Sequence, residues 1–104
     1  MPLVTALREK TYERGLCAEL ARQGIGYSRQ ARYDVFYRGE KIDEYIPDLL
    51  VNEKIIVEVK TAERIIDEHM GQVINYLRIT GLEVGLIINF KHAKLSWKRV
   101  LLDQ

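Results

Sequence analysis

The stretch YIPDLLVNEKIIVEVK, which runs from Tyr45 to Lys60, decides how this chain folds. Apolar residues dominate both of its ends, and the polar triplet at positions 52–54 separates them. This pattern predicts two antiparallel strands joined by a turn. We therefore expect strands over about 42–51 and 55–60, with a three-residue loop between them.

A three-residue loop decides which side chains face each other across this hairpin. Val51 then pairs with Ile55, and counting outward places Asp48 directly opposite Glu58. Directly opposed residues share a face, with Cβ atoms about 4.5–5.5 Å apart. Lys60 lies two positions beyond Glu58 and therefore shares that face. A two-residue loop would instead put the two acids on opposite faces of the sheet.

The opposed acids allow two interpretations. Like charges that face each other destabilise a hairpin unless another group intervenes. A divalent cation would convert the repulsion into ligation, and carboxylate oxygens at this separation suit Mg²⁺ or Mn²⁺. The plain alternative is an edge-strand salt bridge from Asp48 or Glu58 to Lys60. The apolar residues around Glu58 argue against a fully solvated pair, but register alone leaves both interpretations open.

Periodicity and turn residues define the elements on either side of the hairpin. They predict helices over about 3–23 and 62–79, and strands over about 31–37, 84–90 and 95–102. The apolar side of the second helix is formed by Ile66, Met70, Val73 and Leu77, and the run 84–90 is typical of a strand buried on both faces. The order is a helix, a three-stranded meander, a helix and one or two further strands. It predicts a single α/β domain over 1–104 with a mixed sheet.

Both predicted helices also carry polar residues at helical spacing. Glu9 lies on the inward stripe of the first helix and offers a third carboxylate, although Glu13 occupies nearly the same stripe and competes with it. His69, Gln72 and Tyr76 form one line on the second helix. Spacing alone favours ordinary solvated helix faces for both sets.

Composition excludes several classes of protein. The chain has 104 residues, 47% of them hydrophobic, which is typical of one globular domain. Its single cysteine, Cys17, excludes an internal disulfide framework, a Cys-based zinc site and a four-Cys iron–sulfur cluster, and it fits a reducing cytoplasm. No apolar run is long enough to span a membrane, and no signal-peptide pattern is present. A net charge of +1 does not by itself indicate a nucleic-acid binder.

The assembled pattern resembles a known group of enzymes. Pro47-Asp48, nine residues and then Glu58-Val59-Lys60 is similar to the motif of the PD-(D/E)XK nuclease superfamily. More narrowly, the chain resembles the GxxExxY family within it, over the stretches 9–13, 45–51, 56–60, 72–77 and 85–90. The name motif of that family begins with Gly, and the matching position here is Ala6.

The resemblance implies a restriction-endonuclease-like core and a metal-dependent nuclease that hydrolyses phosphodiester bonds of DNA. It implies Mg²⁺, or Mn²⁺, held by Asp48, Glu58 and the carbonyl of Val59, with Glu9 on the metal or its water, Lys60 beside the attacking water or phosphate, and Gln72 and Tyr76 on the nucleic acid. The alternative is a nuclease-fold module with little or no activity that binds nucleic acid or serves a larger complex. A domain this small often acts on duplexes as a dimer, so we also expect a homodimer.

Overall fold

The computed structural model describes residues 2–102, with side chains from Glu9 onward. Its elements in chain order are α1 (Pro2–Arg22), β1 (Tyr27–Ser28), β2 (Tyr33–Tyr37), β3 (Glu40–Tyr45), β4 (Leu49–Val51), β5 (Ile55–Lys60), α2 (Asp67–Thr80), β6 (Val84–Asn89) and β7 (Ser96–Leu101). Within 2–102, no helix combines the length and the apolar character that a membrane span requires.

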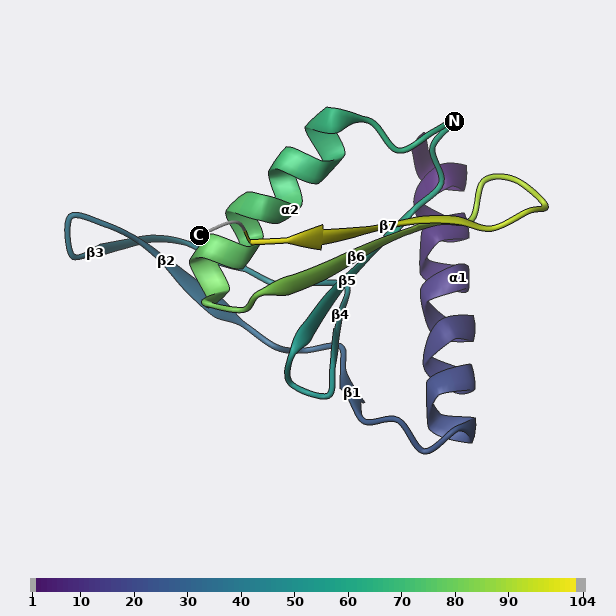
Figure 1. The fold of residues 1–104 in the computed structure, drawn as a ribbon, viewed down its shortest axis with the longest axis horizontal. Coiled ribbons are helices and arrows are strands. Elements are labelled where there is room, and N and C mark those ends of the chain that lie inside the picture. The colour runs from purple at the N-terminus through teal and green to yellow at the C-terminus, as the bar shows by residue number, and fades with distance from the viewer. Residues whose placement is uncertain (1, 103–104) are drawn as a thin grey trace.

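Five strands form the central sheet, in the order β1-β4-β5-β6-β7 (Figure 1). Strands β5 and β6 are parallel because α2 carries the chain back between them, whereas the other neighbours are antiparallel. The predicted α/β fold with a mixed sheet is therefore confirmed.

The two helices cover opposite faces of this sheet, which gives three layers (Figure 1). The core on the α2 face contains Tyr45, Ile56, Val73, Leu77, Ile87 and Val100. The core on the α1 face contains Cys17, Leu49, Val51 and Val57, with Leu16 and Leu20 packed against it. Gly85 lets α2 approach β6 closely, because a Cβ there would lie 2.6 Å from Cγ1 of Val73.

The hairpin of β4 and β5 has the predicted register. Val51 pairs with Ile55, and Leu49 pairs with Val57, so the connecting loop has three residues. Asn52 and Glu53 both adopt positive φ values, 52° and 60°, which turn the chain sharply enough for so short a loop.

The predicted strand over 42–51 is wrong in one respect, because the structure divides it into β3 and β4. The break falls at positions 46–48, where Pro47 has no backbone N–H to donate to a ladder. Strand β3 pairs instead with β2 in a separate two-stranded sheet. The three-stranded meander is therefore not one continuous sheet. The short β1, which pairs with β4 in the structure, was not predicted.

The second helix is shorter than its predicted range of 62–79, because α2 begins at Asp67. Ile66, counted in the apolar stripe, precedes the helix and is 39% exposed, whereas Val73 and Leu77 are buried as predicted. The helix ends at Gly81, whose φ of 77° is left-handed. Strand β6 was predicted to be buried on both faces. Its residues on the α2 face are buried, but those on the α1 face are only half-buried.

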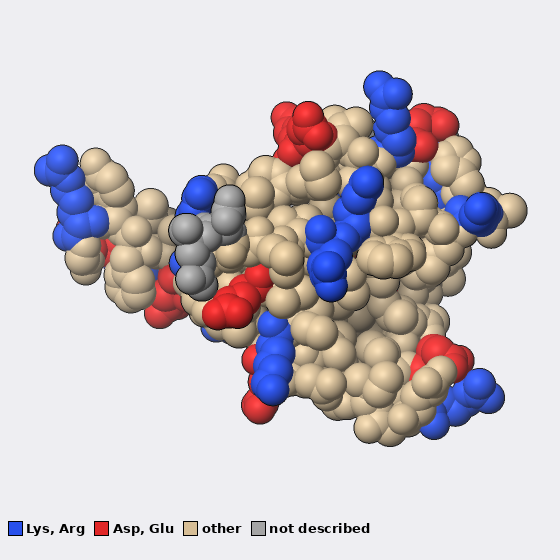
Figure 2. Space-filling model, in the orientation of Figure 1, with Lys and Arg blue, Asp and Glu red and all other residues tan. Residues whose placement is uncertain are grey.

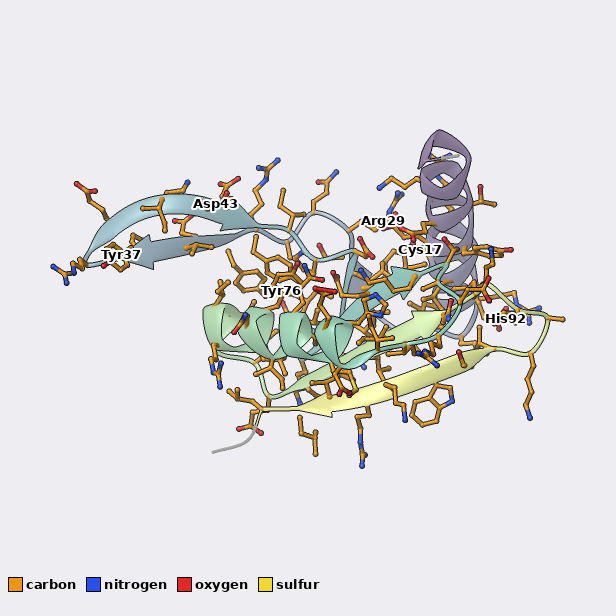
Figure 3. All side chains as sticks on the ribbon, turned by 90° about the horizontal axis from the view of Figure 1, so that it is seen from above. Cys17, Arg29, Tyr37, Asp43, Tyr76 and His92 are labelled. Atoms are coloured by element: carbon orange, nitrogen blue, oxygen red, sulfur yellow. The ribbon has the colours of Figure 1, made fainter. Side chains whose placement is uncertain are left out.

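The β2–β3 hairpin projects away from the body of the molecule (Figures 1 and 3). Tyr37 lies at its far end and is 60% exposed. The base of the hairpin is anchored, since Tyr33 and Val35 pack against the core on the α2 face. On the face seen in Figure 2, basic and acidic side chains are interspersed and form no broad basic patch, in keeping with the net charge of +1.

Candidate active site

Asp48 and Glu58 lie side by side at the point where β4 begins beside β5. The backbone N–H of Asp48 donates to Oε2 of Glu58 at 3.0 Å, and the N–H of Val59 donates to Oδ2 of Asp48 at 2.8 Å. Each carboxylate thus accepts a hydrogen bond from the backbone of the segment that carries the other carboxylate. The ladder itself ends at Leu49 and Val57, and continuing its register by one residue sets Asp48 opposite Glu58, as the three-residue loop predicts.

The environment of this pair opposes negative charge. Burial raises the pKa of Asp48, and the nearby charges of Glu13 and Glu9 raise it further, although the bond from Val59 lowers it. Burial and the charge of Asp48 raise the pKa of Glu58 from 4.5 to about 7. The two acids are therefore held close together in surroundings that favour the protonated form of at least one of them.

Lys60 lies two residues beyond Glu58 on the same face of β5. Its positive charge lowers the pKa of both acids, but burial outweighs this effect. Among the side chains from position 9 to 102, Lys60 forms no ion pair within 4.0 Å with either acid. The edge-strand salt bridge considered from the sequence is therefore not formed.

Glu9 and Glu13 of α1 have different partners. Oε2 of Glu9 accepts hydrogen bonds from the backbone N–H and the hydroxyl of Thr61, both at 3.1 Å. Glu13 is buried and pairs with Arg29 at 3.0 Å and Lys10 at 3.3 Å. Both acids influence Asp48, and Glu13 does so more strongly. The structure thus places Glu9 at the end of β5 and Glu13 beside Asp48.

Tyrosine rings form the α2 side of the candidate site. Tyr45 and Tyr76, the second of which is labelled on α2 in Figure 3, stack with centroids 3.9 Å apart. Burial raises the pKa of Tyr76, and the charges of Glu58 and Asp48 raise it further. Gln72 lies one turn earlier on the helix, and its side chain lowers the pKa of Tyr76. Tyr76 therefore leans toward the acids as expected, while Gln72 is exposed.

Sequence reasoning missed Tyr45 as a neighbour of the acids. Its ring is buried, and the charge of Glu58 contributes to its raised pKa after burial. Its hydroxyl oxygen is buried without a hydrogen-bond partner among the described residues. A signal was available, because Tyr45 stands three residues before Asp48 and directly before the Ile-Pro break.

Asn89 and Phe90, at the end of β6, fix the segment that follows β5. Asn89 is 1% exposed, and its side-chain amide exchanges two hydrogen bonds with the backbone of Ala62, at 2.7 and 3.1 Å. Phe90 stacks on Tyr12 of α1 with centroids 4.8 Å apart. These contacts hold Lys60 and the carboxylate of Glu9 at the same end of the sheet.

The donor set fits Mg²⁺, although a larger cluster is absent. Within the described residues, no group of three or more His, Cys, Asp or Glu side chains is arranged to hold a metal ion. Mg²⁺ is commonly held by one or two carboxylates together with waters and substrate phosphates, and the pair Asp48 and Glu58 fits such an ion. The buried hydroxyl of Tyr45 lies near Glu58, whose charge contributes to its raised pKa.

Comparison with known protein families shows which superfamily the chain belongs to. The family model of the PD-(D/E)XK nuclease superfamily matches residues 2–100. The chain belongs to this superfamily. Its assignment to the narrower GxxExxY family stays a prediction. No functionally curated protein matches the sequence significantly.

Solved structures share the PD-(D/E)XK fold at low sequence identity. The crystal structure of SSO0001 has a TM-score of 0.76 and 15% identity, and it covers 96% of this chain. The structure of LHK-Exo in complex with dAMP has a TM-score of 0.71 and 14% identity, with 96% of this chain covered. A structure of the alkaline exonuclease LHK-Exo from Laribacter hongkongensis has a TM-score of 0.66 and 14% identity over 93%. The chain spans between 52% and 59% of the length of these proteins.

Proposed function

We propose that this chain is a metal-dependent nuclease that hydrolyses phosphodiester bonds of DNA. The observation that carries the proposal is the pair Asp48 and Glu58. Backbone amides hold these two acids beside each other, burial disfavours their charges, and no basic side chain of the described region pairs with either. A site of this kind favours a cation from outside the protein. Membership of a nuclease superfamily and the likeness to LHK-Exo, which binds dAMP, support the same conclusion.

In this proposal Asp48, Glu58 and the carbonyl of Val59 hold Mg²⁺ or Mn²⁺. When bound there, such an ion would supply Lewis-acid chemistry, by lowering the pKa of water and neutralising charge on phosphoryl oxygens. Glu58 must release the proton that burial favours before it can act as a ligand. Lys60 supplies a compact positive charge on the same face, where negative charge develops on the phosphate. Glu9 acts from the N-terminal half of α1, where it fixes Thr61 and with it the end of β5.

Gln72 and Tyr76 contribute to substrate binding in this proposal. Tyr76 is half-buried against Tyr45, so its polar edge remains available beside the acids. Gln72 is exposed on the same line of α2 and extends the polar surface outward. A homodimer and a cytoplasmic location stay predictions.

A second function, nucleic-acid binding with little or no cleavage, is favoured by one observation. The acids of α1 already have partners in this protein, and the described residues offer no third carboxylate arranged for a metal. The two functions differ in metal binding, because a binding module needs no cation at Asp48 and Glu58.

The test measures Mn²⁺ binding by calorimetry and cleavage of single- and double-stranded DNA and RNA. We expect the wild type to bind Mn²⁺ and to cut DNA. Asp48→Ala should lose metal affinity and reduce cleavage by roughly 10³-fold, because a catalytic metal supplies several kcal/mol. Asp34→Ala, on the projecting hairpin, is the matched control and should change neither. A wild type that binds no divalent metal and cuts none of the substrates would overturn the proposal.

A further inference from the structure

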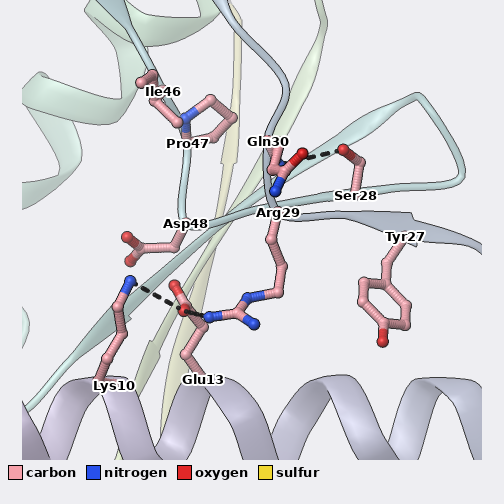
Figure 4. A pocket seen from close by; sticks show the side chains of 9 residues that line it. All are labelled: Lys10, Glu13, Tyr27, Ser28, Arg29, Gln30, Ile46, Pro47 and Asp48. Atoms are coloured by element: carbon pink, nitrogen blue, oxygen red, sulfur yellow. Dashed lines mark hydrogen bonds and ion pairs between the residues drawn. The ribbon is translucent and has the colours of Figure 1, made fainter.

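An open hollow of about 460 Å³ adjoins Asp48 on the α1 side of the sheet. Figure 4 shows the side chains around it, which come from α1, from the segment around β1 and from the break before β4: Lys10, Glu13, Tyr27, Ser28, Arg29, Gln30, Ile46, Pro47 and Asp48. Its size falls within the range of pockets that bind small organic ligands. The metal proposal does not use this hollow except through Asp48.

Two cations converge in the hollow on a single acid. Arg29 and Lys10 both contact Oε2 of Glu13, whose side chain is only 5% exposed (Figure 4). A guanidinium group carries five N–H donors, and the recorded bond to Glu13 uses one nitrogen of Arg29. The side chain of Arg29 lines the hollow and is 38% exposed, so Glu13 does not shut it off from a ligand. Glu13 thus holds Arg29 in one place without consuming its capacity to bind an anion.

An aromatic ring and small polar groups stand beside these cations. Tyr27 is fixed by the pairing of β1 with β4, yet 38% of it is exposed, and it lines the same hollow as Arg29 (Figure 4). Ser28 and Gln30 add a hydroxyl and an amide to the lining. A planar base can stack on an exposed tyrosine, while a phosphate takes charge-assisted bonds from an arginine.

We propose that this hollow binds one nucleotide of the substrate strand next to the scissile bond. Arg29 and Lys10 bind its phosphate, and Tyr27 contacts its base. The inference rests on the proposed nuclease function, because Asp48 links the hollow to the acid pair. A nucleotide seated here places the neighbouring phosphodiester beside Asp48 and Glu58. Arg29 then determines where the strand lies, whereas Glu13 is a positioning residue that acts through Arg29.

The experiment titrates the metal-free protein in EDTA with deoxyadenosine 5′-monophosphate, deoxyadenosine and inorganic phosphate, and follows backbone amide shifts by NMR. We expect the nucleotide to bind at least about tenfold more tightly than the nucleoside, with shifts at positions 27–30. Arg29→Ala should weaken nucleotide binding by about tenfold or more. Arg22→Ala is the matched control, because Arg22 also pairs with a glutamate of α1 but is not among the residues lining the hollow, and it should stay within about twofold of wild type.

Two further variants keep the test decisive. Arg29→Ala leaves the buried Glu13 with Lys10 alone, so Glu13→Gln/Arg29→Gln removes both charges together and should still lose the affinity. Tyr27→Ala should weaken binding of the nucleotide by at least about fivefold and leave inorganic phosphate unchanged, which separates a nucleotide site from a plain phosphate site.

Three outcomes would overturn the inference. These are equal effects of Arg29→Ala and Arg22→Ala, wild-type affinity in the charge-free double variant, or no effect of Tyr27→Ala on the nucleotide. Failure of the proposed function appears separately, as a wild type that cuts no substrate with Mn²⁺. If the nucleotide binds at the hollow through Arg29 but no substrate is cut, the binding site is supported and the proposed nuclease function is contradicted.

Discussion

Glu13 and Glu58 are both carboxylic acids withdrawn from water, and the protein treats them in opposite ways. Glu13 has two cationic partners, Arg29 and Lys10, within 3.3 Å. Glu58 faces a second acid, Asp48, and its pKa rises to about 7. Both acids lie near the same end of the sheet, on α1 and on β5.

The difference separates a structural charge from a functional one. Removing an acid from water is costly unless a cation accompanies it. The protein provides that cation for Glu13 and leaves it out for Glu58 and Asp48. An acid pair left uncompensated in a folded protein costs stability, so its presence points to a role that needs it. The predictions that follow test whether the two acids differ in this way.

The largest expected effect concerns Lys60, the nearest positive charge on the face of Glu58. Its ammonium cannot ligate a cation, so Lys60→Ala should leave Mn²⁺ affinity intact or raise it. Cleavage should fall by roughly 10²–10³-fold, which is the scale of losing one well-placed electrostatic group. Lys60→Arg should rescue poorly, because a planar fork does not replace a compact charge. Single-turnover cleavage beside calorimetric Mn²⁺ binding measures both quantities.

Lys54→Ala is the matched control for Lys60, because Lys54 lies in the exposed turn at the other end of β5. It should change neither metal binding nor cleavage. Wild-type cleavage by Lys60→Ala with normal metal binding would make Lys60 an ordinary surface residue. The difference between Glu13 and Glu58 would then not reflect a catalytic role for the face that carries Glu58.

The next effect concerns how the stability of the metal-free protein depends on pH. The folded-state pKa of Glu58, about 7, lies above its ordinary value of 4.5, so the folded state binds the proton more tightly than the unfolded state. Stability should therefore fall as pH rises from about 4.5 to 7, by up to roughly 3 kcal/mol. Glu58→Gln should flatten this slope, as urea unfolding in EDTA at a series of pH values would detect. A stability that rises across this window, and is unchanged by Glu58→Gln, would show that Glu58 is compensated like Glu13.

The sequence predicted those features that depend on periodicity and loop length. Helical spacing predicted both helices, although α2 begins later than expected, and the loop at 52–54 was enough to bring Asp48 opposite Glu58. The break at Pro47 was missed because the apolar run continues through it, and only the preference of β3 for β2 reveals two sheets. The β-propensity of its residues does not determine which neighbouring strand a strand pairs with.

The partners of the acids on α1 were beyond sequence reasoning for a similar reason. Glu9 and Glu13 are one turn apart, and their spacing predicts that both face inward. Their roles are decided by residues distant in sequence, since Thr61 meets Glu9 and Arg29 meets Glu13. Tyr45 was missed in the same way, because its proximity to Glu58 arises only where the chain bends before β4.

A smaller effect on stability is expected at Glu13 itself. Glu13→Gln keeps a hydrogen-bond acceptor for Arg29 but removes the charge, and should destabilise the protein by about 1–3 kcal/mol in urea unfolding. Asp48→Asn, which also keeps an acceptor, should leave metal-free stability equal or higher, because it relieves repulsion with Glu58. Glu19→Gln, at an exposed pair on the same helix, is the control and should stay within about 0.5 kcal/mol. Destabilisation by Asp48→Asn as large as that by Glu13→Gln would show that the two acids do not differ.

The smallest effect is expected at Glu9, which stands between the two cases. Its Oε2 accepts hydrogen bonds from Thr61, as a structural acid would. Its charge also raises the pKa of Asp48. Glu9→Gln keeps the acceptor and should cost less than about 1 kcal/mol of stability. If Glu9 acts on the metal only through its water, Mn²⁺ affinity should fall by about tenfold, the lower end for a group that supports the ligands. A double-mutant cycle with Thr61→Val isolates the contact between the two residues. A loss of Mn²⁺ affinity equal to that of Asp48→Ala would make Glu9 a direct ligand, and unchanged affinity would make it a structural acid like Glu13.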